Sequence, residues 1–160
     1  MYNKLLEAPQ SESNTPQSET QVQTSNNLTQ AIQKHLGENY SQSRRNQTGF
    51  SDCSSFVGKV LKDAGITAFQ GLPTAASMYE SNKLISVSKA QPGDLIFFRG
   101  TDNRGKNYVS HIGIVADVDT NGNPTKMAHA SARQYKKTVV VDYNPNYWNK
   151  FKPEIKRLKI

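Results

Sequence analysis

The spacing of the apolar residues changes at about residue 83, and this change limits the folds that the chain can adopt. Up to that point apolar residues recur every three or four positions, which is typical of helices. Beyond it they alternate with polar residues, which is typical of strands. Helices followed by a run of strands predict an α+β fold with an antiparallel sheet.

The helical part is expected to contain three helices. The clearest follows Ser51 or Asp52, either of which can cap it, and it ends at Gly65. Shorter helices are expected over 28–36 and 75–81, where apolar residues again share one face.

Turn residues divide the remainder of the chain into short apolar segments. The candidate strands are 84–87, 94–99, 110–118, 126–131 and 138–143, with a weaker one at 155–159. The longest unbroken apolar run is Leu95–Phe98. A spanning helix needs about 18–20 apolar residues, so no membrane span is expected.

The N-terminal segment is polar: residues 9–27 contain a single apolar residue, Val22. Such a segment cannot offset the entropy lost on ordering. We therefore expect 1–27 to be a disordered polar tail and 28–160 to form one folded domain. The apolar stretch at the start is too short for a signal peptide. Either a leader has been removed, or the chain is exported by another route, or it stays inside.

The positive charge is unevenly placed. The formal net charge is +7, and since residues 1–27 carry −2, residues 28–160 carry +9. A basic balance favours polyanionic surroundings such as nucleic acid, acidic lipid or a cell-wall polymer. The alternative is a surface that only keeps the protein soluble.

The single cysteine, Cys53, comes directly after the probable helix cap. The N–H groups and the positive end of the helix dipole there are expected to stabilise a thiolate and lower the thiol pKa, which makes Cys53 a candidate nucleophile. The alternative is a buried, inert cysteine. One cysteine allows no intrachain disulfide.

Two histidines fall on predicted strands. His111 opens a strand on which Gly113 shares its face and leaves room for another group. His129 lies between small residues on a later strand, where a histidine can orient a catalytic base. His35 is expected to be a surface or packing residue. No spacing among these residues supports a zinc site, and no metal or other cofactor is expected.

Four segments around these residues resemble those of the NlpC/P60 cysteine peptidases of bacterial cell walls, and they occur in the family's order. They are Asp52–Val57, Gln91–Phe98, Ser110–Val115 and Ala128–Ser131. The resemblance covers the chain from about Tyr40 to Tyr143. It differs in two places: Ser55 stands where the family usually has glycine, and Ser-Gln-Ser-Arg-Arg at 41–45 replaces an aromatic-glycine-glycine element.

The resemblance implies a papain-like α+β fold, with the nucleophile's helix packed on an antiparallel sheet, so that 28–160 is the catalytic domain. It implies hydrolysis of amide bonds in peptidoglycan stem peptides, often between D-glutamate and a diamino acid. Cys53 would be the nucleophile, His111 the general base and His129 the orienting residue. The residues expected to bind substrate or oxyanion are Tyr40, Asp52 and Ser54.

Alternatives remain open from the sequence. The same centre could serve an N-acetylmuramoyl-L-alanine amidase of related fold. The aromatic and basic residues of 147–152 could instead belong to a non-catalytic wall-binding or nucleic-acid-binding module, although nucleic acid is not the expected partner. The expected partner is peptidoglycan, in the periplasm or at the cell wall. As a further hypothesis, the protein is a delivered toxin or lysis factor with an inhibitor or immunity protein that plugs its cleft.

A catalytic role for His129 carries a geometric condition. If 110–118 and 126–131 are adjacent antiparallel strands, paired residues have a constant sum of residue numbers. A two-residue Asn121-Gly122 turn gives 243 and places His129 on the face opposite His111. The hypothesis therefore requires an even sum near 240, produced by an odd-length loop or a bulge.

Overall fold

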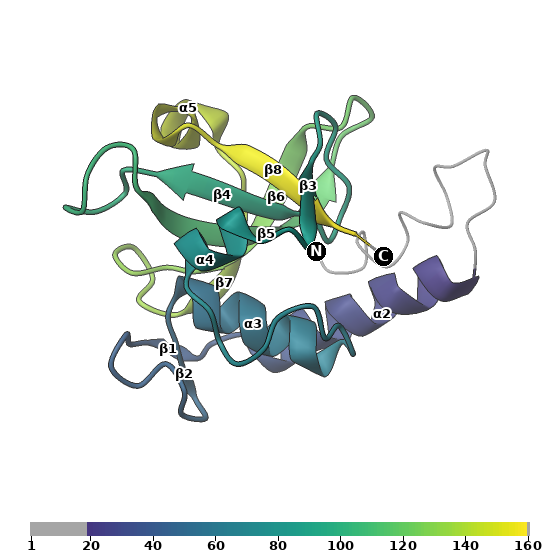
Figure 1. Ribbon diagram of the computed structural model, residues 1–160, viewed down its shortest axis with the longest axis horizontal. Helices are drawn as coiled ribbons and strands as arrows, with labels where there is room; N and C mark the ends of the chain where they lie inside the picture. Colours follow the sequence, from purple (N-terminus) through teal and green to yellow (C-terminus); the bar gives the residue numbers. More distant parts are fainter. Residues whose placement is uncertain (1–18, 160) are drawn as a thin grey trace.

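The computed structural model describes residues 19–159, which form an α+β fold around one six-stranded sheet (Figure 1). Its strands are β3 (Leu84–Ser86), β4 (Leu95–Arg99), β5 (Val109–Val118), β6 (Pro124–Ala130), β7 (Thr138–Asp142) and β8 (Glu154–Leu158). The spatial order is β3-β8-β4-β5-β6-β7, and every pair is antiparallel. The predicted fold class and all six candidate strands are confirmed.

The central helix, α3 (Cys53–Asp63), begins where the sequence predicts. Asp52 is its N-cap: its carboxylate accepts a hydrogen bond from the Ser55 N–H, and the Ser55 hydroxyl bonds back to the Asp52 backbone. This capping box fixes the first turn of the helix. The short helix α4 (Ala75–Glu80) is capped by Thr74 and also matches its prediction.

The first helix is longer than the sequence analysis predicts. Helix α2 (Glu19–Lys34) includes residues 19–27, which were assigned to the disordered tail. No proline or glycine interrupts 19–34, and a hydrogen bond from Gln23 to Asn27 supports the added turns, so helix formation continues into the polar segment. The rest of the predicted tail, 1–18, lies outside the described residues.

The segment between α2 and α3 spans residues 35–52. It contains two short strands, β1 (Asn39–Tyr40) and β2 (Phe50–Ser51), which pair in parallel. A bridge from Asn39 to Lys137 ties this unit to the connection between β6 and β7. Across residues 19–159 no helix is both long and apolar enough to cross a membrane.

The sheet separates two apolar clusters. Helices α2 and α3 lie on one side of the sheet, and α5 (Pro145–Trp148) lies on the other (Figure 1). The large cluster, on the side of α3, includes Phe56, Phe97, Ile112, Ile114 and Ala128. The small cluster, on the side of α5, is formed by Ala90, Ile96, Phe98, Val115 and Met127, with Trp148 and Phe151 packed against it.

Gly113 has a packing role on the side of the small cluster. A Cβ at this position would lie 2.7 Å from the sulfur of Met127, which is closer than real Cβ contacts. The room expected beside His111 is therefore filled by the Met127 side chain.

The register of β5 and β6 meets the condition set for His129. Ile114 pairs with Ala128 and Val118 with Pro124, and both pairs have the even sum 242. The two irregularities on either side of Asp117 shift the register in opposite directions and cancel. The even sum is thus set by the odd-length connection 119–123. His111 and His129 consequently face the same side of the sheet, as predicted.

Candidate active site

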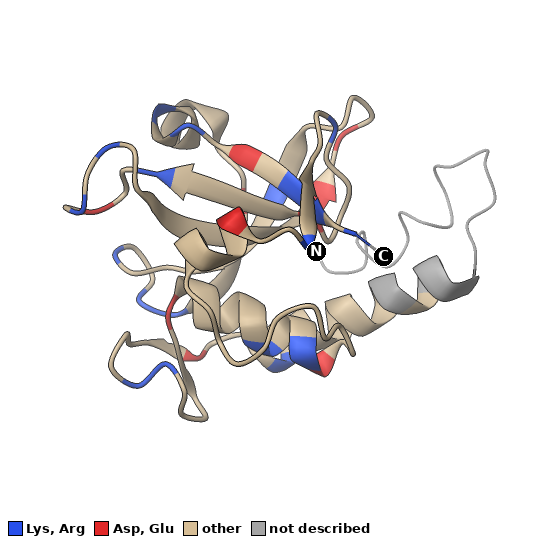
Figure 2. Ribbon diagram, in the orientation of Figure 1, with Lys and Arg blue, Asp and Glu red and all other residues tan. Residues whose placement is uncertain are grey.

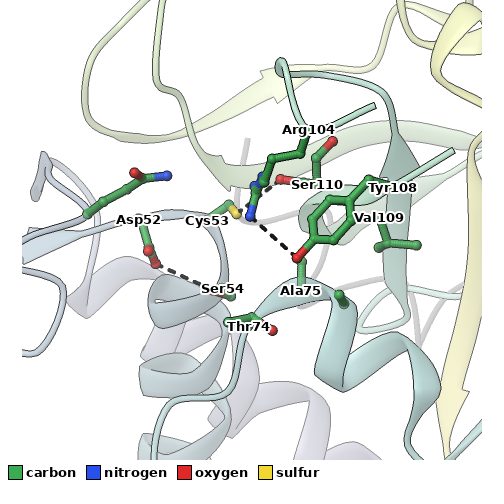
Figure 3. A pocket seen from close by; sticks show the side chains of 11 residues that line it. Asp52, Cys53, Ser54, Thr74, Ala75, Arg104, Tyr108, Val109 and Ser110 are labelled. Carbon is green, nitrogen blue, oxygen red and sulfur yellow. Dashed lines mark hydrogen bonds between the residues drawn. The ribbon is translucent and has the colours of Figure 1, made fainter. Parts of the chain in front are cut away.

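Cys53 is the first residue of α3, and its thiol lies against the backbone of β5. The thiol is 3.9 Å from the carbonyl oxygen of Ser110 (Figure 3). The N–H of Ile112 donates a hydrogen bond to the sulfur. Ser110 and Ile112 are the two neighbours of His111 along the strand. The helix start therefore brings the sulfur to the point in β5 from which the His111 side chain projects.

His111 and His129 form a direct pair. A hydrogen bond of 2.9 Å joins Nε2 of His111 to Nδ1 of His129, and the two rings are nearly perpendicular, at 88°. The two side chains lie diagonally across β5 and β6, which the register allows. His129 is buried, with 6% of its surface exposed, so its ring is fixed by packing as well as by this bond.

Aromatic rings enclose the histidine pair. The indole of Trp148 lies parallel to the His111 ring, with 5.6 Å between ring centroids and an angle of 7°, and it meets His129 edge-on. Phe98 contacts both His111 and Trp148. The chain after β7 therefore returns to cover the histidines with an indole that shields their hydrogen bond from water.

Burial dominates the ionisation of all three groups. Burial and the Asp52 carboxylate together raise the pKa of the Cys53 thiol to about 11, while N–H groups of Ile112 and Ser54 act in the opposite direction. Burial lowers the pKa of His111 to about 4 and that of His129 to about 3. The expectation that the helix start lowers the thiol pKa is wrong for this structure, because burial and Asp52 outweigh it. At neutral pH the site holds a thiol and two neutral imidazoles.

Asp52 and Ser54 are held by an arginine from the segment that departs from the family pattern. The guanidinium of Arg45 donates to the Asp52 carboxylate at 2.8 Å and to the Ser54 hydroxyl at 2.9 Å, and it also bonds the carbonyl of Leu72. Both acceptors are buried. Arg45 therefore stabilises the start of α3, and the side chains of Asp52 and Ser54 already accept its hydrogen bonds.

Tyr40 lies near Cys53 and Asp52. Burial and the charges of Cys53 and Asp52 together raise the pKa of Tyr40 to about 12, so its hydroxyl is within electrostatic range of both residues. The side chain is partly buried against the large cluster together with Cys53. The structure thus brings the six residues predicted for the site into one region.

A narrow cleft of about 60 Å³ opens beside the thiol. Ser54, Thr74 and Ala75 line one wall, and the opposite wall comes from the connection between β4 and β5 (Figure 3). That wall includes Arg104, whose guanidinium lies over the ring of Tyr108 at 4.5 Å. Within residues 19–159, no three or more His, Cys, Asp or Glu side chains are grouped so as to hold a metal ion.

Three residues of this region escaped the sequence analysis: Arg45, Arg104 and Trp148. Two of them lie in loops without periodicity, and Trp148 was considered only as part of the alternative binding segment 147–152. Their importance depends on contacts with residues far away in the chain, such as Trp148 with His111. The replacement of small and aromatic residues by Arg44 and Arg45 was visible, but nothing local indicated what Arg45 binds.

Comparison with known proteins gives a consistent result. The family model described as "NlpC/P60 family" matches residues 37–157. A protein named "Probable endopeptidase p60" from Listeria seeligeri is 43% identical over 83 residues, which are 51% of this chain and 14% of that protein. A Bacillus subtilis protein named "Bifunctional muramidase/DL-endopeptidase CwlT" is 42% identical over 83 residues, 51% of this chain and 23% of that protein. The chain thus spans less than a quarter of the length of these relatives.

Solved structures agree with the fold. A Staphylococcus aureus protein described as similar to lipoprotein, NLP/P60 family, superposes with a TM-score of 0.65 at 26% identity, over 93% of this chain and 45% of that one. The P60 domain of an antigen from M. avium subspecies paratuberculosis gives a TM-score of 0.59 at 20% identity, over 86% of this chain and 97% of that one.

Proposed function

The chain belongs to the NlpC/P60 family, and we propose that it is a cysteine peptidase that hydrolyses amide bonds in peptidoglycan stem peptides. The observation that carries the proposal is the meeting of three groups. The Cys53 thiol rests against the β5 backbone on both sides of His111, and His111 is hydrogen-bonded to His129. Nucleophile, base and orienting residue are arranged in this order in cysteine hydrolases.

The proposed reaction begins with a neutral pair. Because its pKa is about 4, His111 is unprotonated at neutral pH and can accept the Cys53 proton as the sulfur attacks the amide carbonyl. The Cys53 backbone N–H at the helix start is positioned to donate to the oxyanion. His111 then protonates the leaving amine, a thioester remains on Cys53, and water hydrolyses it to the free acid.

This reaction requires a particular tautomer of His111. If Nδ1 takes the thiol proton, Nε2 must already carry its own proton, and that proton is donated to Nδ1 of His129 across the 2.9 Å bond. His129 stays neutral, which its pKa of about 3 favours. We assign to His129 and Trp148 the role of positioning residues that hold this tautomer and ring orientation.

The relatives' names support a choice of bond. One is a "DL-endopeptidase", which favours cleavage between a D- and an L-residue of the stem peptide over cleavage of the muramoyl amide. We place the activity in the periplasm or at the cell wall, where that polymer lies.

Digestion of purified peptidoglycan tests the proposal. Mass spectrometry of the released fragments should show new amine and carboxyl ends within the stem peptide after treatment with the full chain, and none with Cys53→Ala. Release of intact stem peptides from the glycan would indicate an amidase instead. Sedimentation with the polymer without any new ends would indicate a binding module and contradict the proposal.

A further inference from the structure

Two connections line the cleft beside the thiol: 41–49 through Gln42, and 100–108 through Arg104 and Tyr108. A third connection, 131–137, adjoins both. The Tyr40 N–H donates to the carbonyl of Lys136 at 2.9 Å, which joins the first to the third. Arg104 holds the pKa of Asp102 low and the charge of Arg133 lowers it further, so the third connection lies within electrostatic range of the second. We refer to these three connections together as the rim of the cleft.

The rim is strongly cationic. Its charged residues are seven cations, Arg44, Arg45, Arg104, Lys106, Arg133, Lys136 and Lys137, and one anion, Asp102. Figure 2 shows these blue segments gathered at one end of the molecule, around the start of α3. The carboxylate beside the thiol and the single anion of the rim are already engaged, since Arg45 binds Asp52 and Arg104 binds Asp102. The remaining field attracts anions to the cleft.

Arg104 is the rim cation that reaches the thiol. Its guanidinium lies between Cys53 and Tyr108 in Figure 3, and the two charges of Arg104 and Cys53 affect each other's pKa. Nε of Arg104 donates a hydrogen bond to the Asp102 carboxylate at 2.9 Å, and the guanidinium packs over the ring of Tyr108. The Nη1 group has the Tyr108 hydroxyl at 3.5 Å, the outer limit of a hydrogen bond.

We propose that Arg104 selects substrates that carry a free carboxylate next to the amide attacked by Cys53. This inference rests on the proposed function and adds to it the chemical class of the substrate. A guanidinium that is oriented by Asp102 and half exposed, and whose Nη1 bond to Tyr108 is long at 3.5 Å, matches a carboxylate in charge and in hydrogen-bond geometry. A primary amide at the same position offers no charge and competes poorly.

A matched pair of peptides tests the inference. Both have the same stem-peptide sequence, one with a free carboxylate beside the scissile bond and the other with the corresponding primary amide. For the full chain we expect kcat/KM for the acid to exceed kcat/KM for the amide by about tenfold or more. Arg104→Gln should bring the ratio near one, and Arg104→Lys should restore part of it.

The ratio of the two substrates, rather than either rate, is the readout. Loss of Arg104 also removes a charge that stabilises the thiolate, which slows both substrates alike and leaves the ratio unaffected. Lys106→Gln is the matched control, because it removes one charge from the same connection at a position outside the cleft lining. It should retain the preference for the acid.

Failure of the inference is distinguishable from failure of the proposed function. Cleavage of both peptides at equal rates, or a preference that persists in Arg104→Gln, would overturn the role of Arg104 while hydrolysis stands. If neither peptide is cleaved, calorimetry measures the affinity of the Cys53→Ala variant for each peptide. Tighter binding of the acid than of the amide supports the inference if this difference disappears when Arg104→Gln is added. Equal or absent binding of the two peptides overturns it.

Discussion

The two faces of the sheet are built differently. The face toward α3 buries the large cluster, a continuous set of aliphatic and aromatic side chains from three helices and the sheet. The opposite face buries only a few apolar side chains and adds two histidines and an indole to them. The nucleophile comes from the first side and the histidines from the second. Stability and chemistry are thus largely separated, and they meet at the start of β5.

The largest effect is expected at the point where the two faces meet. Cys53→Ala should lower the rate of peptide hydrolysis by at least about 10³-fold, because the variant has no nucleophile. Thermal unfolding should be nearly unchanged, since the side chain loses one sulfur atom at a partly exposed position. A variant with near-normal turnover would show that the chemistry takes place elsewhere.

Two neighbouring phenylalanines on β4 test the separation of roles directly. Phe97 and Phe98 are both buried but point to the large and the small cluster, respectively. Phe97→Ala should reduce the free energy of unfolding by about 3–5 kcal/mol while the remaining folded enzyme keeps its kcat. Phe98→Ala should cost less stability and lower kcat, because Phe98 contacts His111 and Trp148.

Denaturant titrations and single-temperature kinetics on both variants provide this comparison. The separation would be broken by a Phe97 variant that loses kcat in its folded fraction, or by a Phe98 variant that loses only stability.

The histidine face should also make stability depend on pH. In the unfolded chain a histidine binds a proton at its ordinary pKa of 6.5, whereas folded His111 and His129 do so only near 4 and 3. Between these values the unfolded state binds more protons, so the free energy of unfolding falls as pH is lowered from about 6.5 to about 4. Each pKa unit is worth about 1.4 kcal/mol, so a loss of a few kcal/mol is expected.

Urea titrations across this pH range measure the effect. His129→Gln removes one of the two buried bases and should make the decline shallower. An equally steep decline in this variant would assign the pH dependence to other groups.

The smallest effect is expected from the indole that covers the pair. Trp148→Ala should lower kcat about tenfold, because water then reaches the hydrogen bond between His111 and His129. It should also raise the lower pKa of the pH-rate profile, since His111 becomes better solvated. Phe151→Ala, in the same segment but with no ring contact to either histidine, is the control. If Trp148→Ala changed the stability but neither kcat nor the pH-rate profile, Trp148 would only pack against its neighbours.

Local patterns were enough to predict most of the elements. The single apolar face and the cap of α3, and the alternation of β4 to β7, depend on neighbours within one or two turns of chain. The even register of β5 and β6 followed from the requirement that two side chains share a face. The order of the strands, with β8 inserted between β3 and β4, depends on long-range packing and was not predicted.

The site was only partly predictable for the same reason. The positions of Cys53 and His111 at the starts of elements are visible in the sequence. The burial of Cys53, the contacts of Arg45 and the indole over His111 depend on other parts of the chain: Arg45 bonds Asp52 7 positions away, and Cys53 contacts Ser110 57 positions away. Trp148 covers His111 from 37 positions along the chain. No period or motif records such contacts. The start of α2 was missed because a polar segment free of proline and glycine can be either coil or helix.

The connection 119–123 between β5 and β6 tolerates only certain insertions and deletions. Because side chains alternate along β5 and β6, insertion or deletion of two residues at this tip would keep His129 on the side of His111. A change of one residue would turn it toward α3 unless a new bulge absorbed the shift. A surface turn far from the thiol, at which substitutions should be harmless, is therefore a place where the loss of a single codon can disable the enzyme.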